Sequence, residues 1–101
     1  MRIVNSKEFE ESTKEGLVLV DFFANWCGPC RMIAPVLEEL EEDIEKLTVV
    51  KVDVDQEGAL AGKYGVQSIP NMIIFKDGQP VDRIVGFMSY DDLQETIEKY
   101  L

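Results

Sequence analysis

The sequence predicts an α/β domain built on a central mixed sheet of about five strands, flanked by about four helices. Three observations predict this class. Helical and extended patterns alternate along the chain, residues 17–23 are apolar on both faces, and two extended runs flank the turn Asp77-Gly78. The early crossovers imply parallel strands, and the Asp-Gly turn adds an antiparallel hairpin. With 101 residues, 46% of them hydrophobic, the chain suits one domain over residues 1–101.

A short edge strand at residues 2–4 and a helix after Asn5 are the first elements expected. Asn5 suits the N-cap of this helix, and Glu8, three residues later, completes a capping box. Gly16 is placed to end the helix, because glycine tolerates the left-handed backbone found just past many helix ends.

Residues 17–23 are expected to form a central strand covered on both faces, because only Asp21 interrupts the apolar run. The helix that follows the cysteines has apolar residues at helical spacing, namely Ile33, Val36, Leu37, Leu40 and Ile44. Pro35 lies inside this helix and predicts a kink near Arg31, since proline removes a backbone donor.

A strand at residues 48–54 and a short helix at residues 56–64 are expected next. A hairpin of residues 72–76 and 81–85 and a last helix after Ser89 complete the predicted order. Gly65 is the expected stop of the short helix. Ser89 is the expected cap of the last helix, and its apolar residues Leu93, Ile97 and Leu101 are predicted to face inward.

Cys27 and Cys30 are the only cysteines and lie between the central strand and the following helix. A helix N-terminus has unpaired N–H groups and a partial positive charge, and both favour a thiolate. Cys27 precedes the first turn and is expected to feel this field most, with Cys30 inside the turn and more buried. We therefore expect Cys27 to attack a foreign disulfide and Cys30 to resolve the mixed disulfide. A bridge closing so short a loop stabilises little, so the pair is interpreted as reactive.

The main alternative for such a pair is half of a zinc site. Zinc needs about four ligands, usually Cys or His, and the chain has no His and no third Cys. No metal is therefore expected within one chain. Two other hypotheses stay open at this point: a metal or iron–sulfur cluster shared between two chains, and a binding module in which redox chemistry is incidental.

The formal net charge of −10 disfavours binding to nucleic acid and to anionic membranes, which need basic patches. No run approaches a membrane span, and the first five residues do not resemble a signal peptide. The sequence therefore predicts a cytoplasmic protein, and in the cytoplasm thiols stay reduced and an isolated cysteine pair is typically catalytic. A monomer is expected.

The segment VDFFANWCGPC at residues 20–30 resembles the active-site segment of the thioredoxin family. Similar runs extend over nearly the whole chain: KVDVD, YGVQSIP, FKDG and VG, at residues 51–55, 64–70, 75–78 and 85–86. A bare Cys-x-x-Cys is weakly specific. The full Trp-Cys-Gly-Pro-Cys, with Asp21 before it and Ile69-Pro70 after it, is highly specific, and it implies the thioredoxin fold.

The resemblance implies a protein-disulfide reductase with no bound cofactor. Its partners would be disulfide-containing protein substrates and a flavin-containing thioredoxin reductase, which uses NADPH to restore the dithiol from a Cys27–Cys30 disulfide. An oxidase or isomerase is the alternative within the family. Relatives with those roles often carry His between the cysteines, so Gly28 and Pro29 favour reduction.

Asp21 interrupts an apolar strand, so its carboxyl is expected where water is scarce. Desolvation raises the pKa of such a group and suits it to proton transfer near neutral pH. The resemblance implies that Asp21 assists deprotonation of Cys30 and that Lys51 is its lysine partner. An equal alternative is that Lys51 lies on a sheet face with its ammonium in solvent.

The resemblance also implies a cis peptide bond between Ile69 and Pro70, although most Xaa-Pro bonds are trans. The Ile69 backbone would pair with an extended substrate segment. A shallow, mostly apolar groove is expected around the disulfide, from Trp26, Gly28, Pro29, Val66, Ile69, Pro70, Gly86 and Phe87. Core packing is the alternative for Val66 and Phe87. Asn71 stands where the family commonly has threonine, which changes local hydrogen bonds and groove polarity.

Overall fold

The computed structural model describes residues 1–101 and contains five strands and four helices. The strands are β1 (Arg2–Ile3), β2 (Leu17–Phe23), β3 (Leu47–Asp53), β4 (Asn71–Lys76) and β5 (Gln79–Val85). The helices are α1 (Ser6–Thr13), α2 (Gly28–Asp43), α3 (Gly58–Lys63) and α4 (Tyr90–Glu98). The strands form one sheet in the order β1-β3-β2-β4-β5. The β1–β3 and β2–β3 pairs are parallel, whereas β2–β4 and β4–β5 are antiparallel, so the predicted mixed sheet is confirmed.

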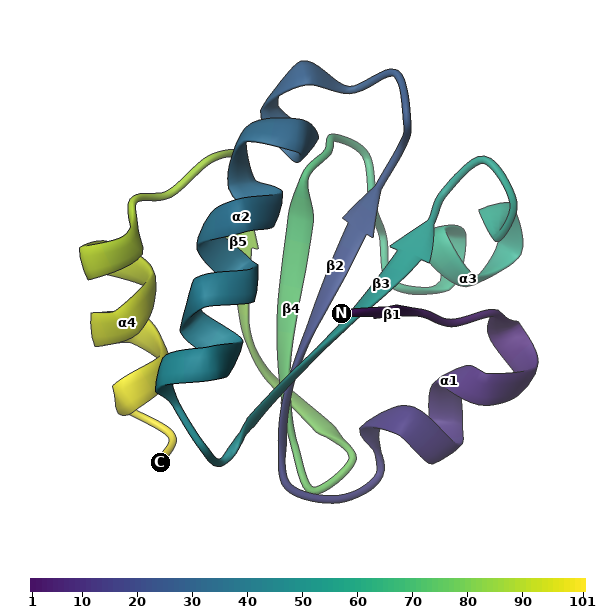
Figure 1. The fold of residues 1–101 in the computed structure, drawn as a ribbon. Coiled ribbons are helices and arrows are strands. Elements are labelled where there is room, and N and C mark those ends of the chain that lie inside the picture. Colours follow the sequence, from purple (N-terminus) through teal and green to yellow (C-terminus); the bar gives the residue numbers. More distant parts are fainter.

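Helices α2 and α4 cover one face of the sheet, and α1 and α3 cover the other (Figure 1). Successive side chains of β2 enter the two layers alternately. Leu17 and Leu19 belong to the apolar cluster under α2 and α4, and Val18 and Val20 belong to the cluster under α1 and α3. All seven residues of β2 are buried, which is why the run is apolar at both odd and even positions. Asp21 has the same parity as Leu19 and therefore lies on the α2 side.

The predicted capping box begins α1. The Glu8 backbone N–H donates to Oδ1 of Asn5 at 3.0 Å, and the Asn5 backbone N–H donates to Oε1 of Glu8 at 3.1 Å. Each hydrogen bond satisfies a backbone donor that has no partner within the helix. This cap anchors the chain between β1 and α1.

Removal of this cap is expected to lower the free energy of unfolding. Asn5→Ala should cost about 1 kcal/mol, because the Glu8 N–H loses the side-chain acceptor and keeps only the Asn5 carbonyl oxygen. Asn5→Gly should cost only a few tenths, because without a Cβ the first-turn N–H groups stay open to water. Urea unfolding followed by circular dichroism measures both variants. Equal destabilisation by alanine and glycine would contradict the capping explanation.

Some boundaries differ from the sequence prediction. Helix α3 begins at Gly58, two residues later than expected, and Gly65 follows it with φ of 67°, as a glycine stop requires. The prediction that Leu101 faces inward is wrong, because α4 ends at Glu98 and the Leu101 side chain is 54% exposed. Helix α2 continues through Pro35, and the kink stays a prediction. No helix combines the length and apolar character that crossing a membrane requires.

Candidate active site

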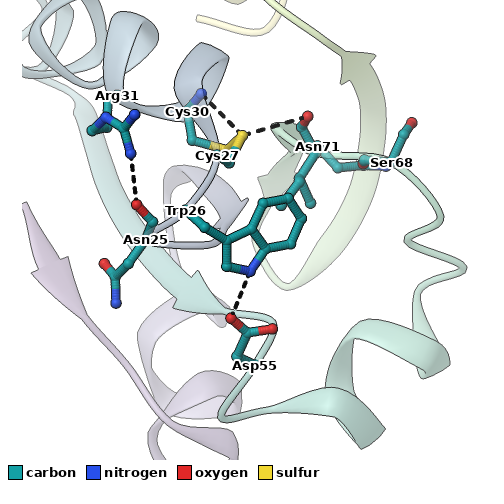
Figure 2. The surroundings of a disulfide bond; sticks show 9 residues. Asn25, Trp26, Cys27, Cys30, Arg31, Asp55, Ser68 and Asn71 are labelled. Carbon is teal, nitrogen blue, oxygen red and sulfur yellow. Dashed lines mark hydrogen bonds between the residues drawn. A yellow bond between two sulfur atoms is a disulfide. The ribbon is translucent and has the colours of Figure 1, made fainter.

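The two cysteines lie where β2 gives way to α2. Cys27 is the N-cap of α2, and its Sγ accepts a hydrogen bond from the Cys30 backbone N–H at 3.2 Å. Pro29 lies in the first turn, where its missing N–H leaves no helical hydrogen bond unmade. The two sulfurs are joined in a disulfide, with the Cα atoms 5.3 Å apart (Figure 2). The disulfide therefore lies at the positive end of the helix dipole.

Exposure does not distinguish the two cysteines. The whole-residue exposed fractions are 4% for Cys27 and 3% for Cys30, so the expectation that Cys30 is clearly more buried is not met. Their contacts do differ. Sγ of Cys27 accepts the helical N–H and lies 3.8 Å from the carbonyl oxygen of Ile69, whereas Cys30 lines a cavity of about 200 Å³ on the other side.

Asp21 is fully buried, and neither of its carboxylate oxygens has a hydrogen-bond partner. Burial raises the pKa of Asp21 to about 6, and the positive charge of Lys51 opposes this rise. The predicted raised pKa is confirmed. A carboxyl group with this pKa changes its protonation state close to neutral pH, which most aspartates do not.

Lys51 is the direct neighbour of Asp21 on the adjacent parallel strand β3. Its side chain is half-buried, and its Nζ lies 4.2 Å from the centre of the Phe23 ring, a cation–π distance. The same side chain lines the cavity beside Cys30. Lys51 therefore acts on Asp21 through its charge, without a direct ion pair.

The Ile69-Pro70 peptide bond is cis, as the resemblance implied. The buried Pro70 leads directly into β4, and its carbonyl oxygen accepts a hydrogen bond from the Gly86 N–H at 2.8 Å. Gly86 has φ of 86°, a conformation that side-chain-bearing residues rarely adopt. The ends of β4 and β5 are thereby joined beside the disulfide.

Exposed apolar side chains lie in two parts of the site: Trp26 precedes Cys27, and Phe87 follows Gly86. Trp26 is 69% exposed and Phe87 is 49% exposed, so core packing is the wrong reading for Phe87. Val66 is half-buried and packs against the apolar cluster under α1 and α3. We call Trp26 and Phe87, together with Gly28, Pro29, Ile69 and Gly86, the disulfide rim. Its role as a substrate groove stays a prediction.

Several polar partners around the site were not predicted from the sequence. The Trp26 indole Nε1 donates to Oδ2 of Asp55 at 2.9 Å, and Nη1 of Arg31 donates to the carbonyl oxygen of Asn25 at 2.8 Å (Figure 2). Asp55 is exposed and belongs to the KVDVD run, whose resemblance to the family was the one feature of the sequence that could have indicated a site residue here. No group of three or more His, Cys, Asp or Glu side chains is arranged to hold a metal ion.

The sequence and the structure were both compared with known proteins. The sequence profile described as thioredoxin matches residues 1–99. Thioredoxin of Staphylococcus aureus is 52% identical over 99 residues, covering 97% of this chain and 95% of the relative.

Solved thioredoxins have the same fold. A thioredoxin structure from Plasmodium falciparum superposes with a TM-score of 0.91 at 39% identity, and one from Fasciola hepatica superposes with 0.91 at 42%. Each comparison covers 100% of both chains. Because the match runs through the cysteine pair as well as the sheet and helices, the chain belongs to the thioredoxin family and is a thiol–disulfide oxidoreductase.

Proposed function

We propose that this chain reduces disulfides in other proteins, with Cys27 as the nucleophile and Cys30 as the resolving thiol. The observation that carries the proposal is the hydrogen bond from the Cys30 N–H to Sγ of Cys27 at the N-cap of α2. In the reduced protein this donor and the helix dipole both stabilise a Cys27 thiolate. The thiolate is the form that attacks a disulfide.

The reaction consists of two exchanges. The Cys27 thiolate forms a bond to one substrate sulfur, and the other substrate sulfur leaves as a thiolate. The Cys30 thiolate then attacks Sγ of Cys27, which forms the Cys27–Cys30 disulfide and releases the second substrate thiolate. Two electrons pass to the substrate, and its two thiolates take up protons to become thiols.

Asp21 is proposed to accept the proton that Cys30 loses before the second exchange. Its pKa of about 6 makes it a stronger base than an ordinary aspartate while leaving most of it ionised at pH 7. The cavity of about 200 Å³ lined by Cys30 and Lys51 is large enough for water, but Asp21 is not among its lining residues, so the proton would have to pass from the cavity to the buried carboxyl. Lys51 lines this cavity and keeps the pKa of Asp21 from rising further.

The disulfide rim is proposed to bind the substrate polypeptide. Trp26 and Phe87 offer exposed apolar surface, and the Ile69 carbonyl oxygen lies 3.8 Å from the Cys27 sulfur. An extended substrate segment would pair with that backbone. Gly28, Pro29 and Gly86 would allow the segment to approach closely, and Pro70 and Val66 are proposed to complete the binding surface.

We further infer that residues 1–101 act as one domain, as a monomer in the cytoplasm. A flavin-containing thioredoxin reductase, using NADPH, would restore the dithiol. Family membership supports the partners, and the net charge of −10 argues against nucleic acid and anionic membranes.

If the chain reduces its substrates rather than oxidising them, the Cys27–Cys30 couple should have a low reduction potential. The Cys27–Cys30 couple should lie well below the approximately −120 mV of strong disulfide oxidants, because no His between the cysteines stabilises the thiolate. Equilibration in glutathione buffers measures it, with fluorescence of Trp26, the only tryptophan, as the signal. Pro29→His is the matched control and should raise the potential. A wild-type value near −120 mV would assign the chain to the oxidases.

A further inference from the structure

Asn71 has an unusual environment for a polar side chain. It is 2% exposed, it follows Pro70 directly, and its amide forms two hydrogen bonds. Nδ2 donates to the carbonyl oxygen of Ser68 at 3.3 Å, and Oδ1 accepts from Nη1 of Arg83 at 3.0 Å. Ser68 and Asn71 flank Ile69 and Pro70, on the side of the disulfide where the Ile69 carbonyl oxygen faces Cys27 (Figure 2). Asn71 thus connects the residues before the proline to strand β5.

Arg83 extends this connection to the end of α3. Its Nη2 donates to the carbonyl oxygen of Tyr64, the C-cap of α3. The Arg83 guanidinium and the Asn71 amide therefore hold both ends of one loop, residues 64–68. A planar guanidinium suits this task, because its donors point in fixed directions to two acceptors at once.

A β-bulge in the hairpin puts Arg83 on the correct face. The pairing of β4 with β5 shifts between Ile74 and Phe75, so that Arg83 lies opposite Ile73. Ile73 belongs to the α1 and α3 side, the same side as Asn71 two residues earlier. A hairpin without the bulge would be shifted by one residue and would turn Arg83 to the other face.

The loop has few other attachments. Val66 N–H donates to the carbonyl oxygen of Ala61 at the start of the loop, and Gly86 holds Pro70 at its end. Between them, at residues 67–69, the Asn71–Ser68 contact is the only nitrogen–oxygen hydrogen bond. Ile69, whose carbonyl oxygen lies 3.8 Å from Sγ of Cys27, packs its side chain against the cluster of Phe23, Ala24 and the two cysteines. The hydrogen bond that holds its backbone segment comes from Asn71, which Arg83 holds in turn.

We propose that Asn71 and Arg83 are positioning residues for protein substrates: they fix the loop so that the Ile69 backbone is ready to pair with an extended polypeptide beside Cys27. The inference rests on the proposed substrate-binding role of Ile69. It also predicts selectivity. A polypeptide disulfide needs the paired backbone, whereas a small aromatic disulfide such as dithiobis(nitrobenzoate) has no backbone to pair.

The test compares single-turnover reduction of a protein disulfide and of dithiobis(nitrobenzoate) by the pre-reduced protein. Arg83→Met removes both donors and keeps most of the side-chain stem. The ratio of the protein rate to the small-disulfide rate should fall roughly fivefold, the effect of about one lost hydrogen bond. Lys7→Met removes one exposed positive charge from α1 and should leave the ratio unchanged. An unchanged ratio in Arg83→Met would overturn the proposal.

Asn71→Asp provides a second variant. Aspartate still accepts from Arg83 but cannot donate to the Ser68 carbonyl, so the ratio should fall here too. Amide ¹⁵N relaxation should show larger amplitudes at Ser68 and Ile69 in both variants. Unchanged relaxation, or an equal loss on both substrates, would contradict positioning and indicate a general loss of fold or chemistry.

Phe87→Ser separates this inference from the proposed function. Phe87 belongs to the disulfide rim and makes no hydrogen bond with Asn71 or Arg83. A lower rate ratio in Phe87→Ser with an unchanged ratio in Arg83→Met would reject the positioning role of Asn71 and Arg83. It would still support the disulfide rim as the surface that binds the substrate. An unchanged ratio in both variants would reject the rim as the substrate surface, and the positioning proposal with it.

Discussion

Replacing Cys27 with serine is expected to lower single-turnover reduction of a protein disulfide by on the order of a thousandfold or more. The Cys27 sulfur is the one that accepts the Cys30 N–H at the N-cap of α2. A serine hydroxyl in its place stays protonated at neutral pH and is a poor nucleophile without an adjacent base. The measurement is stopped-flow reaction of the fully reduced variant with a protein that contains one accessible disulfide.

Cys30→Ser is the matched control, because it removes a sulfur three residues away and leaves the first attack in place. This variant should accumulate a mixed disulfide with the substrate, visible in the mass spectrum as one added substrate chain. An adduct on Cys27→Ser and none on Cys30→Ser would reverse the two roles. Full activity in Cys27→Ser would favour the alternative of a binding module in which the cysteines are incidental.

The fold was largely predictable because its signals are local. The unbroken apolar run of β2 requires layers on both faces, and the sheet has them, with alternate residues in two clusters. The Asn5–Glu8 box sets the start of α1, and Asp77-Gly78 sets the hairpin turn. The failure at Leu101 has a local cause as well, since helical spacing continued in the sequence beyond the point where α4 ends.

The site was less predictable because its contacts are not local. The cis bond at Pro70 came from family resemblance alone, since the residues themselves favour trans. The contact of Arg83 with Asn71 depends on a one-residue shift of register that no hydrophobic pattern marked. Cys27 is as buried as Cys30 because both cysteines belong to one apolar cluster with Phe23 and Ala24, against which Ile69 also packs.

Asp21→Asn is expected to raise the free energy of unfolding of the oxidised protein. In the reduced protein it is expected to slow resolution of the mixed disulfide. Burial raises the pKa of Asp21 from the ordinary value of 3.8 to about 6, so the folded state binds a proton more tightly than the unfolded state does. The stability of the wild type therefore falls as pH rises from about 4 to about 6 and stays low above that. At about 1.4 kcal/mol per pKa unit, the cost of ionised Asp21 above pH 6 is about 3 kcal/mol.

Asparagine has nearly the same shape and no charge, so at pH 7 the variant should unfold with a free energy about 3 kcal/mol higher. Urea unfolding of the oxidised proteins between pH 4 and 8 measures the difference, which should vanish at the acid end. Lys51→Met is the control. Removal of the cation that lowers the pKa of Asp21 should move the falling part of the stability curve to higher pH.

Asp21→Asn should improve stability but impair the reaction rate. This combination distinguishes a carboxyl that takes part in the reaction from one that is only part of the structure. If Asp21 takes the Cys30 proton, Asp21→Asn should slow resolution of the mixed disulfide by roughly a hundredfold, the lower range for a general base. The rise of the wild-type rate near pH 6 should disappear. A variant that gains the stability and keeps the resolution rate would reduce Asp21 to a buried charge without a role in proton transfer. The buried, unpartnered carboxylate costs about 3 kcal/mol when ionised, and this cost is why a role in the chemistry at Cys30 is the hypothesis that the two measurements test together.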